Sequence, residues 1–141
     1  MFYKPLLLPL IIQVALTFLV LIRMYQMRIA EIRGRDIDPQ DFSTRSRAGP
    51  ALQTSAASSD NFVNLFETPV LFYTAILLSL VLMLQDPVIV ALAWMYVILR
   101  ALHSLVHTTY NRVVHRFYLY IMSCLALLGI WVRLGWYVIV S

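Results

Sequence analysis

The chain has 141 residues, of which 61% are hydrophobic and 13% are charged, and its mean hydropathy is +0.78. A water-soluble domain needs more charge to cover its surface, so this composition excludes an ordinary soluble protein and indicates one integral membrane domain over residues 1–141. The formal net charge of +4 comes largely from arginines beside apolar segments. We therefore expect contact with membrane lipids and no binding of nucleic acid.

Four apolar segments are long enough to cross a hydrocarbon core, which needs about 20 residues per helix. They predict transmembrane helices over about residues 5–27, 61–84, 87–110 and 116–140. The expected fold is all-α, an integral membrane four-helix bundle with up-down topology. The first segment is interpreted as a retained helix, because it is longer than a signal-peptide core and no small-residue cleavage site follows it.

The connections between the expected helices differ in length. The short link Gln85-Asp86-Pro87 permits only a tight reversal, in which Asp86 suits the cap of the third helix and Pro87 suits its first turn. Residues 28–60 form a long hydrophilic loop with five arginines. The positive-inside rule places this loop, together with the link between the third and fourth helices, in the cytoplasm, and both termini outside.

Polar side chains open the second apolar segment. Asn64 and Glu67 are three residues apart, so on a continuous helix they share a face, to which Asp60 also belongs. Glu67 lies about one turn inside the segment, where a lone carboxylate is costly. Arg100 on the next helix is its expected partner, and one interpretation is an interhelical ion pair that fixes packing without excluding a ligand role.

A second polar group follows one stripe of the third helix. Arg100, His103 and His107 occupy positions i, i+3 and i+7, near the end that leads to Arg116 and Tyr120 on the fourth helix. Guanidinium groups at one membrane face suit an anionic, peptide-like ligand with carboxylates, and a nearby cation also stabilises a thiolate. The stripe therefore indicates a binding site near the cytoplasmic surface.

Metal and cysteine chemistry give less support for a site. His103 and His107 have the spacing with which two helical imidazoles share a metal, and Glu67 would complete the set. Arg100 on the same stripe would repel a dication, so no metal site is expected. The single cysteine, Cys124, forms no intrachain disulfide and is expected to pack as a small apolar residue.

Two motifs resemble a known family. The pattern Asn-x-x-Glu-x-Pro over residues 64–69 and the pattern Arg-x-x-His-x-x-x-His over residues 100–107 resemble the MAPEG superfamily, the membrane-associated proteins of eicosanoid and glutathione metabolism. The stretch His-Thr-Thr-Tyr-Asn-Arg, residues 107–112, is especially similar to bacterial members, which implies a bacterial inner membrane with the site facing the cytoplasm.

The resemblance implies a homotrimer that binds glutathione between subunits. Its implied activity is that of a transferase or peroxidase, which uses glutathione or another thiol on a lipophilic small-molecule substrate. The resemblance assigns stabilisation of the thiolate to Arg116. The residues that it assigns to glutathione binding are Arg28, Asn64, Glu67, Arg100, His103, His107 and Tyr120.

One difference from the family favours a second hypothesis, in which the protein is not an enzyme. Members that use glutathione carry arginines just before the asparagine of the second helix, where this chain has Asp60, Phe62 and Val63. The alternative is a non-catalytic membrane protein whose polar residues lock helices or subunits together. A small molecule that raises the melting temperature would count against this alternative.

Overall fold

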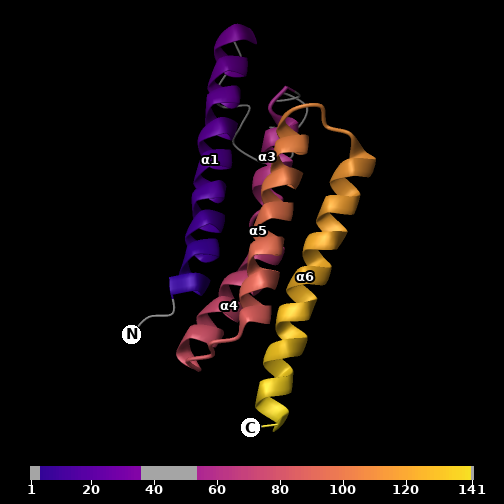
Figure 1. The fold of residues 1–141 in the computed structure, drawn as a ribbon. Coiled ribbons are helices and arrows are strands. Elements are labelled where there is room, and N and C mark those ends of the chain that lie inside the picture. Colours follow the sequence, from indigo (N-terminus) through magenta and orange to yellow (C-terminus); the bar gives the residue numbers. More distant parts are fainter. Residues whose placement is uncertain (1–3, 36–53, 141) are drawn as a thin grey trace.

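The computed structural model describes residues 4–35 and 54–140. Within these ranges the regular structure is helical throughout: α1 (Lys4–Arg35), α3 (Ala56–Asn64), α4 (Thr68–Val81), α5 (Pro87–Thr108) and α6 (Val113–Val140) (Figure 1). Four spans, with α3 and α4 forming one of them, are long and apolar enough to cross a membrane, which confirms the predicted membrane four-helix bundle. The middle of the expected first loop, with Arg45 and Arg47, lies outside the described residues.

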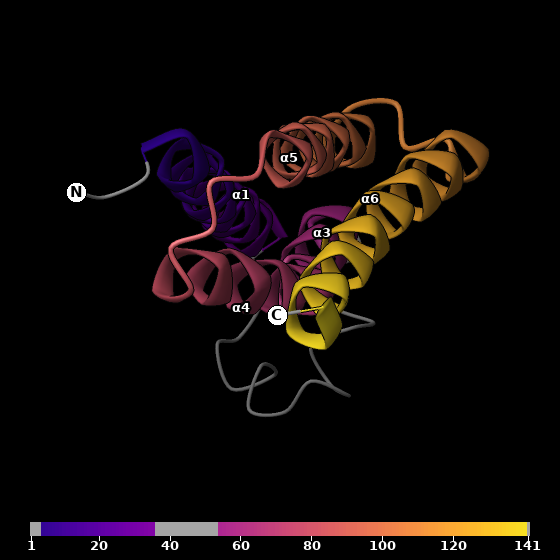
Figure 2. The ribbon, with the colours of Figure 1, turned by 60° about the horizontal axis from the view of Figure 1, so that its bottom comes forward.

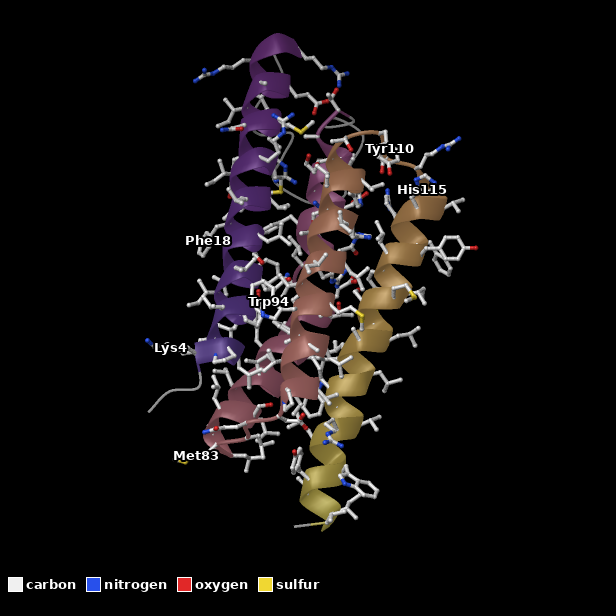
Figure 3. The ribbon with its side chains drawn as sticks, in the orientation of Figure 1. Lys4, Phe18, Met83, Trp94, Tyr110 and His115 are labelled. Atoms are coloured by element: carbon white, nitrogen blue, oxygen red, sulfur yellow. The ribbon has the colours of Figure 1, made fainter. Side chains whose placement is uncertain are left out.

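Successive spans run in opposite directions, as the up-down prediction requires (Figure 1). Lys4 and Met83 lie at one end of the bundle, and Tyr110 and His115 lie at the other, which we call the arginine-rich end (Figure 3). Figure 2 shows α5 between α1 and α6, with α4 across the bundle from α5. The packing of α5 is most extensive against α6.

The first helix continues to Arg35, beyond the end expected near residue 27. Its 32 residues correspond to about 48 Å at 1.5 Å per residue, more than the roughly 30 Å of a hydrocarbon core. Glu31 is buried near its end and accepts hydrogen bonds from the Thr54 amide at 2.9 Å, the Ser55 amide at 3.0 Å and the Ser55 hydroxyl at 2.9 Å. This carboxylate therefore fastens the start of α3 to α1.

The second span is interrupted at residues 65–67, where one helix over 61–84 was expected. Pro69 has no amide hydrogen, and its ring clashes with a carbonyl one turn earlier in a continuous helix. The backbone of Glu67, with φ −87° and ψ −92°, departs from helical geometry. As a result Asn64 ends α3, and the expectation that Asn64 and Glu67 share one continuous helical face is wrong.

The turn between α4 and α5 confirms the prediction for Asp86 and Pro87. Asp86 Oδ1 accepts a hydrogen bond from the Val88 amide at 2.8 Å, and Pro87 is in the first turn of α5. Asp86 Oδ2 accepts bonds from Arg133 Nε at 2.6 Å and from the Tyr137 hydroxyl at 3.1 Å, both on α6. Burial alone would raise the pKa of Asp86, but these hydrogen bonds and the charge of Arg133 hold that pKa below its ordinary value.

The interior is largely apolar. Phe72 of α4 stacks on Tyr96 of α5 with ring centroids 4.5 Å apart, and both side chains are fully buried. Gly129 lies against Leu92, where an added Cβ would stand 3.1 Å from the leucine side chain, so the glycine lets α5 and α6 approach closely. This packing positions the buried polar face of α5 at the arginine-rich end.

Candidate functional site

Arg100 is the central cation of the site, and it is fully buried. Its Nε donates to the Tyr96 hydroxyl at 3.2 Å, and its Nη2 donates to the Thr68 hydroxyl and to the Asn64 carbonyl, the latter at 3.3 Å. The guanidinium carbon lies 4.9 Å from the centroid of the Tyr120 ring, within cation–π distance. Arg100 therefore joins α5 to the break between α3 and α4 and to α6.

The expected ion pair between Glu67 and Arg100 is wrong. Glu67 is exposed, and the ion pairs found within residues 4–35 and 54–140 join Arg35 to Glu31 and Arg133 to Asp86. The break before Pro69 explains the difference. Carbonyl groups at the end of a helix lack intrahelical partners, and the end of α3 offers one of them to Arg100 in place of a carboxylate.

The two histidines of the α5 stripe are buried beside Arg100. His103 Nδ1 lies 3.0 Å from the main-chain carbonyl oxygen of Arg116, and its ring centroid lies 5.9 Å from that of Tyr120 and 5.7 Å from that of His107. His103 Nε2 and both ring nitrogens of His107 have no hydrogen-bond partner among the described residues. The structure thus gathers Arg100, His103, His107 and Tyr120, as the sequence predicted.

Arg116 forms the outer edge of this group. Its Nη1 donates to Asn111 Oδ1 at 2.6 Å, while its buried Nε has no partner in the described part of the chain. Asn111 has a φ of 49°, in the left-handed region that asparagine tolerates better than most residues, and its amide bonds the Val106 carbonyl at 2.8 Å. The turn from α5 to α6 therefore sets the position of the Arg116 guanidinium.

Sequence reasoning missed four residues of the site, and for two of them the spacing gave a signal. Tyr96 and Ser104 lie four residues before and after Arg100, on its helical face. Thr68 directly follows Glu67. Asn61 of α3 is fully buried; its Oδ1 accepts from the Ser104 hydroxyl at 3.1 Å, and its Nδ2 has no partner among the described residues.

The remaining predicted residues differ in how they relate to this group. Arg28 on α1 is half-buried and donates through Nη2 to the Ser59 hydroxyl on α3 at 2.9 Å. Asn64 is half-buried and contributes its carbonyl, whereas Glu67 and Asp60 are exposed. In the part of the chain that the structure describes, no three histidine, cysteine, aspartate or glutamate side chains are grouped so as to hold a metal ion.

Among the buried side-chain atoms of the site that lack a hydrogen-bond partner in the described ranges, donors outnumber acceptors. Arg100 Nη1, Arg116 Nε and Asn61 Nδ2 are buried, can only donate, and have no acceptor within the described ranges. A buried donor without a partner costs about 1–3 kcal/mol. The arrangement suits a ligand rich in acceptors, such as carboxylates, peptide carbonyls or a thiolate.

The fold and the site define an α-helical membrane protein with a buried cationic site at one end of its bundle. The MAPEG family model matches residues 6–136, which is nearly the whole chain. The chain belongs to the MAPEG family and is a membrane protein of the superfamily of glutathione and eicosanoid metabolism. The chain has no match among curated proteins or among solved structures.

Proposed function

We propose that this MAPEG protein is a glutathione or other thiol transferase or peroxidase that acts on lipophilic substrates. The observation that carries the proposal is the donor-rich group of buried side chains around Arg100, at the arginine-rich end of an apolar bundle. Family membership supports a link with glutathione metabolism. Lipophilic substrates would reach this site laterally from the bilayer.

Glutathione matches the chemistry of the site. Its two carboxylates, two peptide carbonyls and thiolate are acceptors, which Arg100 Nη1 and Asn61 Nδ2 would bind. Its single ammonium group would suit the Glu67 carboxylate. Five further residues complete the proposed binding set: Arg28, Asn64, His103, His107 and Tyr120.

Arg116 is the proposed thiolate-stabilising residue. Its buried Nε lacks a partner among the described residues, while the bond from Nη1 to Asn111 fixes the guanidinium in place. A cation that is oriented before the reaction stabilises the thiolate at no reorganisation cost. The protein would thus supply positioning and electrostatics for a nucleophile that belongs to the cofactor.

The proposal includes a homotrimer in a bacterial inner membrane, with the site facing the cytoplasm. Glu67 is exposed in the single chain although it lies within a spanning segment, and a carboxylate that faces acyl chains is costly. A neighbouring copy would cover it. The positive-inside rule assigns the arginine-rich end to the cytoplasm.

The test is the ultraviolet absorbance of thiolate when glutathione is added to the purified protein. The wild type should show the signal, and Arg116→Ala should reduce the thiolate fraction on the order of tenfold, which corresponds to one pKa unit of the bound thiol. Arg112→Ala is the matched control, because Arg112 is exposed and lies one helical turn before Arg116. No binding at millimolar glutathione would reject the glutathione proposal.

A structural role is the second candidate, and the contacts of Arg100 favour it. This one side chain joins the break between α3 and α4 to α5 and α6. A purely structural role predicts that Arg100→Gln disrupts the fold or the assembly and that glutathione leaves the melting temperature of the wild type unchanged. A rise of several degrees with glutathione would count against the purely structural role.

A further inference from the structure

We propose that His103 is the general base that takes the proton from the thiol, an inference that rests on the proposed thiol-dependent activity. The sequence and the family resemblance assign His103 only to binding. The hydrogen bond between its ring and the first turn of α6 points to a second role.

That hydrogen bond fixes the tautomer of the imidazole. The partner of His103 Nδ1, 3.0 Å away, is the carbonyl oxygen of Arg116, and a carbonyl can only accept. Nδ1 therefore carries the hydrogen. In the neutral ring the other nitrogen, Nε2, then has a free lone pair and is a proton acceptor.

The position of Nε2 suits this role. It is buried and has no partner among the described residues, and the ring lies within 6 Å of the Tyr120 ring, which in turn faces the Arg100 guanidinium. His103 Nε2 is thus a basic atom of defined tautomer in a group whose other unpartnered atoms are mostly donors. His115 provides a contrast, because it is exposed and its Nδ1 bonds the Tyr110 hydroxyl at 3.1 Å, outside the group (Figure 3).

The reaction step balances without a further reactant. The S–H bond of the bound thiol breaks, the proton forms an N–H bond at His103 Nε2, and the electron pair stays on sulfur as the thiolate. The thiolate then attacks the lipophilic electrophile, and the imidazolium returns the proton to the leaving group or to the newly charged product atom. No oxidation or reduction occurs in the proton transfer.

Several charged or titratable groups face the two histidines. Arg100 and His107 of α5 and Arg116 of α6 act electrostatically on His103, the Tyr120 ring of α6 lies beside it, and Asp60 of α3 acts on His107. The pH dependence of the reaction therefore reports on this whole group. The assignment to His103 therefore needs a variant that removes only the basic nitrogen of its ring and keeps the donor toward α6.

His103→Asn is that variant. The asparagine Nδ2 retains a donor for the Arg116 carbonyl, whereas the basic nitrogen Nε2 is lost and the amide oxygen of asparagine is not a base. We expect kcat to fall about 100-fold, a typical contribution of general base catalysis, with little change in the affinity for glutathione. The rising limb of the pH–rate profile should move to higher pH, because the thiol must then ionise without the base. His115→Asn is the control and should behave as the wild type.

Two kinetic results would overturn the role of His103: an unchanged kcat and pH profile in His103→Asn, or a loss of activity in this variant that resides entirely in glutathione affinity. Nitrogen-15 NMR of the wild type without ligand gives a separate test, which does not depend on any variant folding. A neutral His103 with its hydrogen on Nδ1 is expected, and hydrogen on Nε2 would contradict the inference. A wild type that never binds glutathione would instead refute the proposed function.

Discussion

Met83, in the turn after α4, adopts a left-handed backbone conformation with a φ of 52°. The Leu84 amide bonds the Ser79 carbonyl at 3.0 Å, so the residue occupies the helix-ending position that glycine usually fills. A side chain costs about 1–2 kcal/mol in this region, and that of Met83 is 83% exposed and packs on little. Met83→Gly should therefore raise the free energy of unfolding by about 0.5–1 kcal/mol, measured by denaturation in detergent micelles.

Leu82→Gly is the matched control for this prediction. Leu82 is the neighbouring residue, also exposed, but its φ of −76° is ordinary for any side chain. Glycine there only adds freedom to the unfolded chain, so stability should fall by about 0.5–1 kcal/mol. A gain in both variants, or a loss in both, would mean that the strain at Met83 is not the cause.

Single residues show what a sequence can and cannot predict. The stripe of Arg100, His103 and His107 is buried as predicted, because helical periodicity alone sets which side chains share a face. The partner of Arg100 was predicted wrongly, since the choice between Glu67 and Thr68 depends on where the backbone breaks. Pro69 gave the signal for that break, but proline alone does not say how far the preceding residues turn.

At the scale of elements, composition predicts where the membrane spans lie, whereas polar contacts determine the residues at which the helices begin and end. Hydropathy locates about 20 apolar residues, and these appear in all four spans. Within the last part of α1, which extends to Arg35, Glu31 meets the start of α3, a contact between residues more than 20 positions apart. Such a contact leaves no local pattern in the sequence.

The Glu31 contact predicts how firmly α3 is held. Ser55, which precedes α3, makes no capping hydrogen bond with its own side chain, and the Glu31 carboxylate instead accepts from the Thr54 and Ser55 amides. A carboxylate also suits the positive end of a helix dipole. Glu31→Gln should lower the free energy of opening of α3 by about 1–2 kcal/mol, measured by hydrogen exchange of its amides.

Asp60→Asn is the control for Glu31→Gln, because Asp60 is an exposed acid within α3. It removes the same charge at the same end of the bundle but leaves the contact between α1 and α3 in place. Exchange in α3 should then stay close to the wild type. Equal acceleration in both variants would indicate a general charge effect and would contradict the capping role of Glu31.

At the scale of the whole molecule, Asp86 joins the turn before α5 to α6 at the end of the bundle opposite the site. Its pKa lies below the ordinary aspartate value of about 3.9, so its contribution to stability is complete above that value and is lost as the pH falls through the folded-state pKa. Asp86→Asn should lower the melting temperature by several degrees at neutral pH. The difference from the wild type should shrink as the pH drops below about 4, and a difference that is constant with pH would contradict the prediction.

The orientation of the whole bundle in the membrane can be tested at its two ends, the arginine-rich end and the end that holds Lys4 and Met83. About 20 residues from Lys4 to Arg23 correspond to roughly 30 Å of helix, so α1 beyond Arg23 should stand outside the hydrocarbon core on the arginine-rich side. Single cysteines placed in a Cys124→Ala background, and treated with a membrane-impermeant maleimide in sealed vesicles, test this. Arg33→Cys should react in inverted vesicles and Met83→Cys in right-side-out vesicles. Phe18→Cys should react in neither, because Phe18 lies within the apolar part of α1 and points away from the bundle (Figure 3). Reaction of Arg33→Cys and Met83→Cys from the same side would contradict the up-down topology, whereas an exchange of their sides would preserve the topology and reverse the assignment of the site to the cytoplasm.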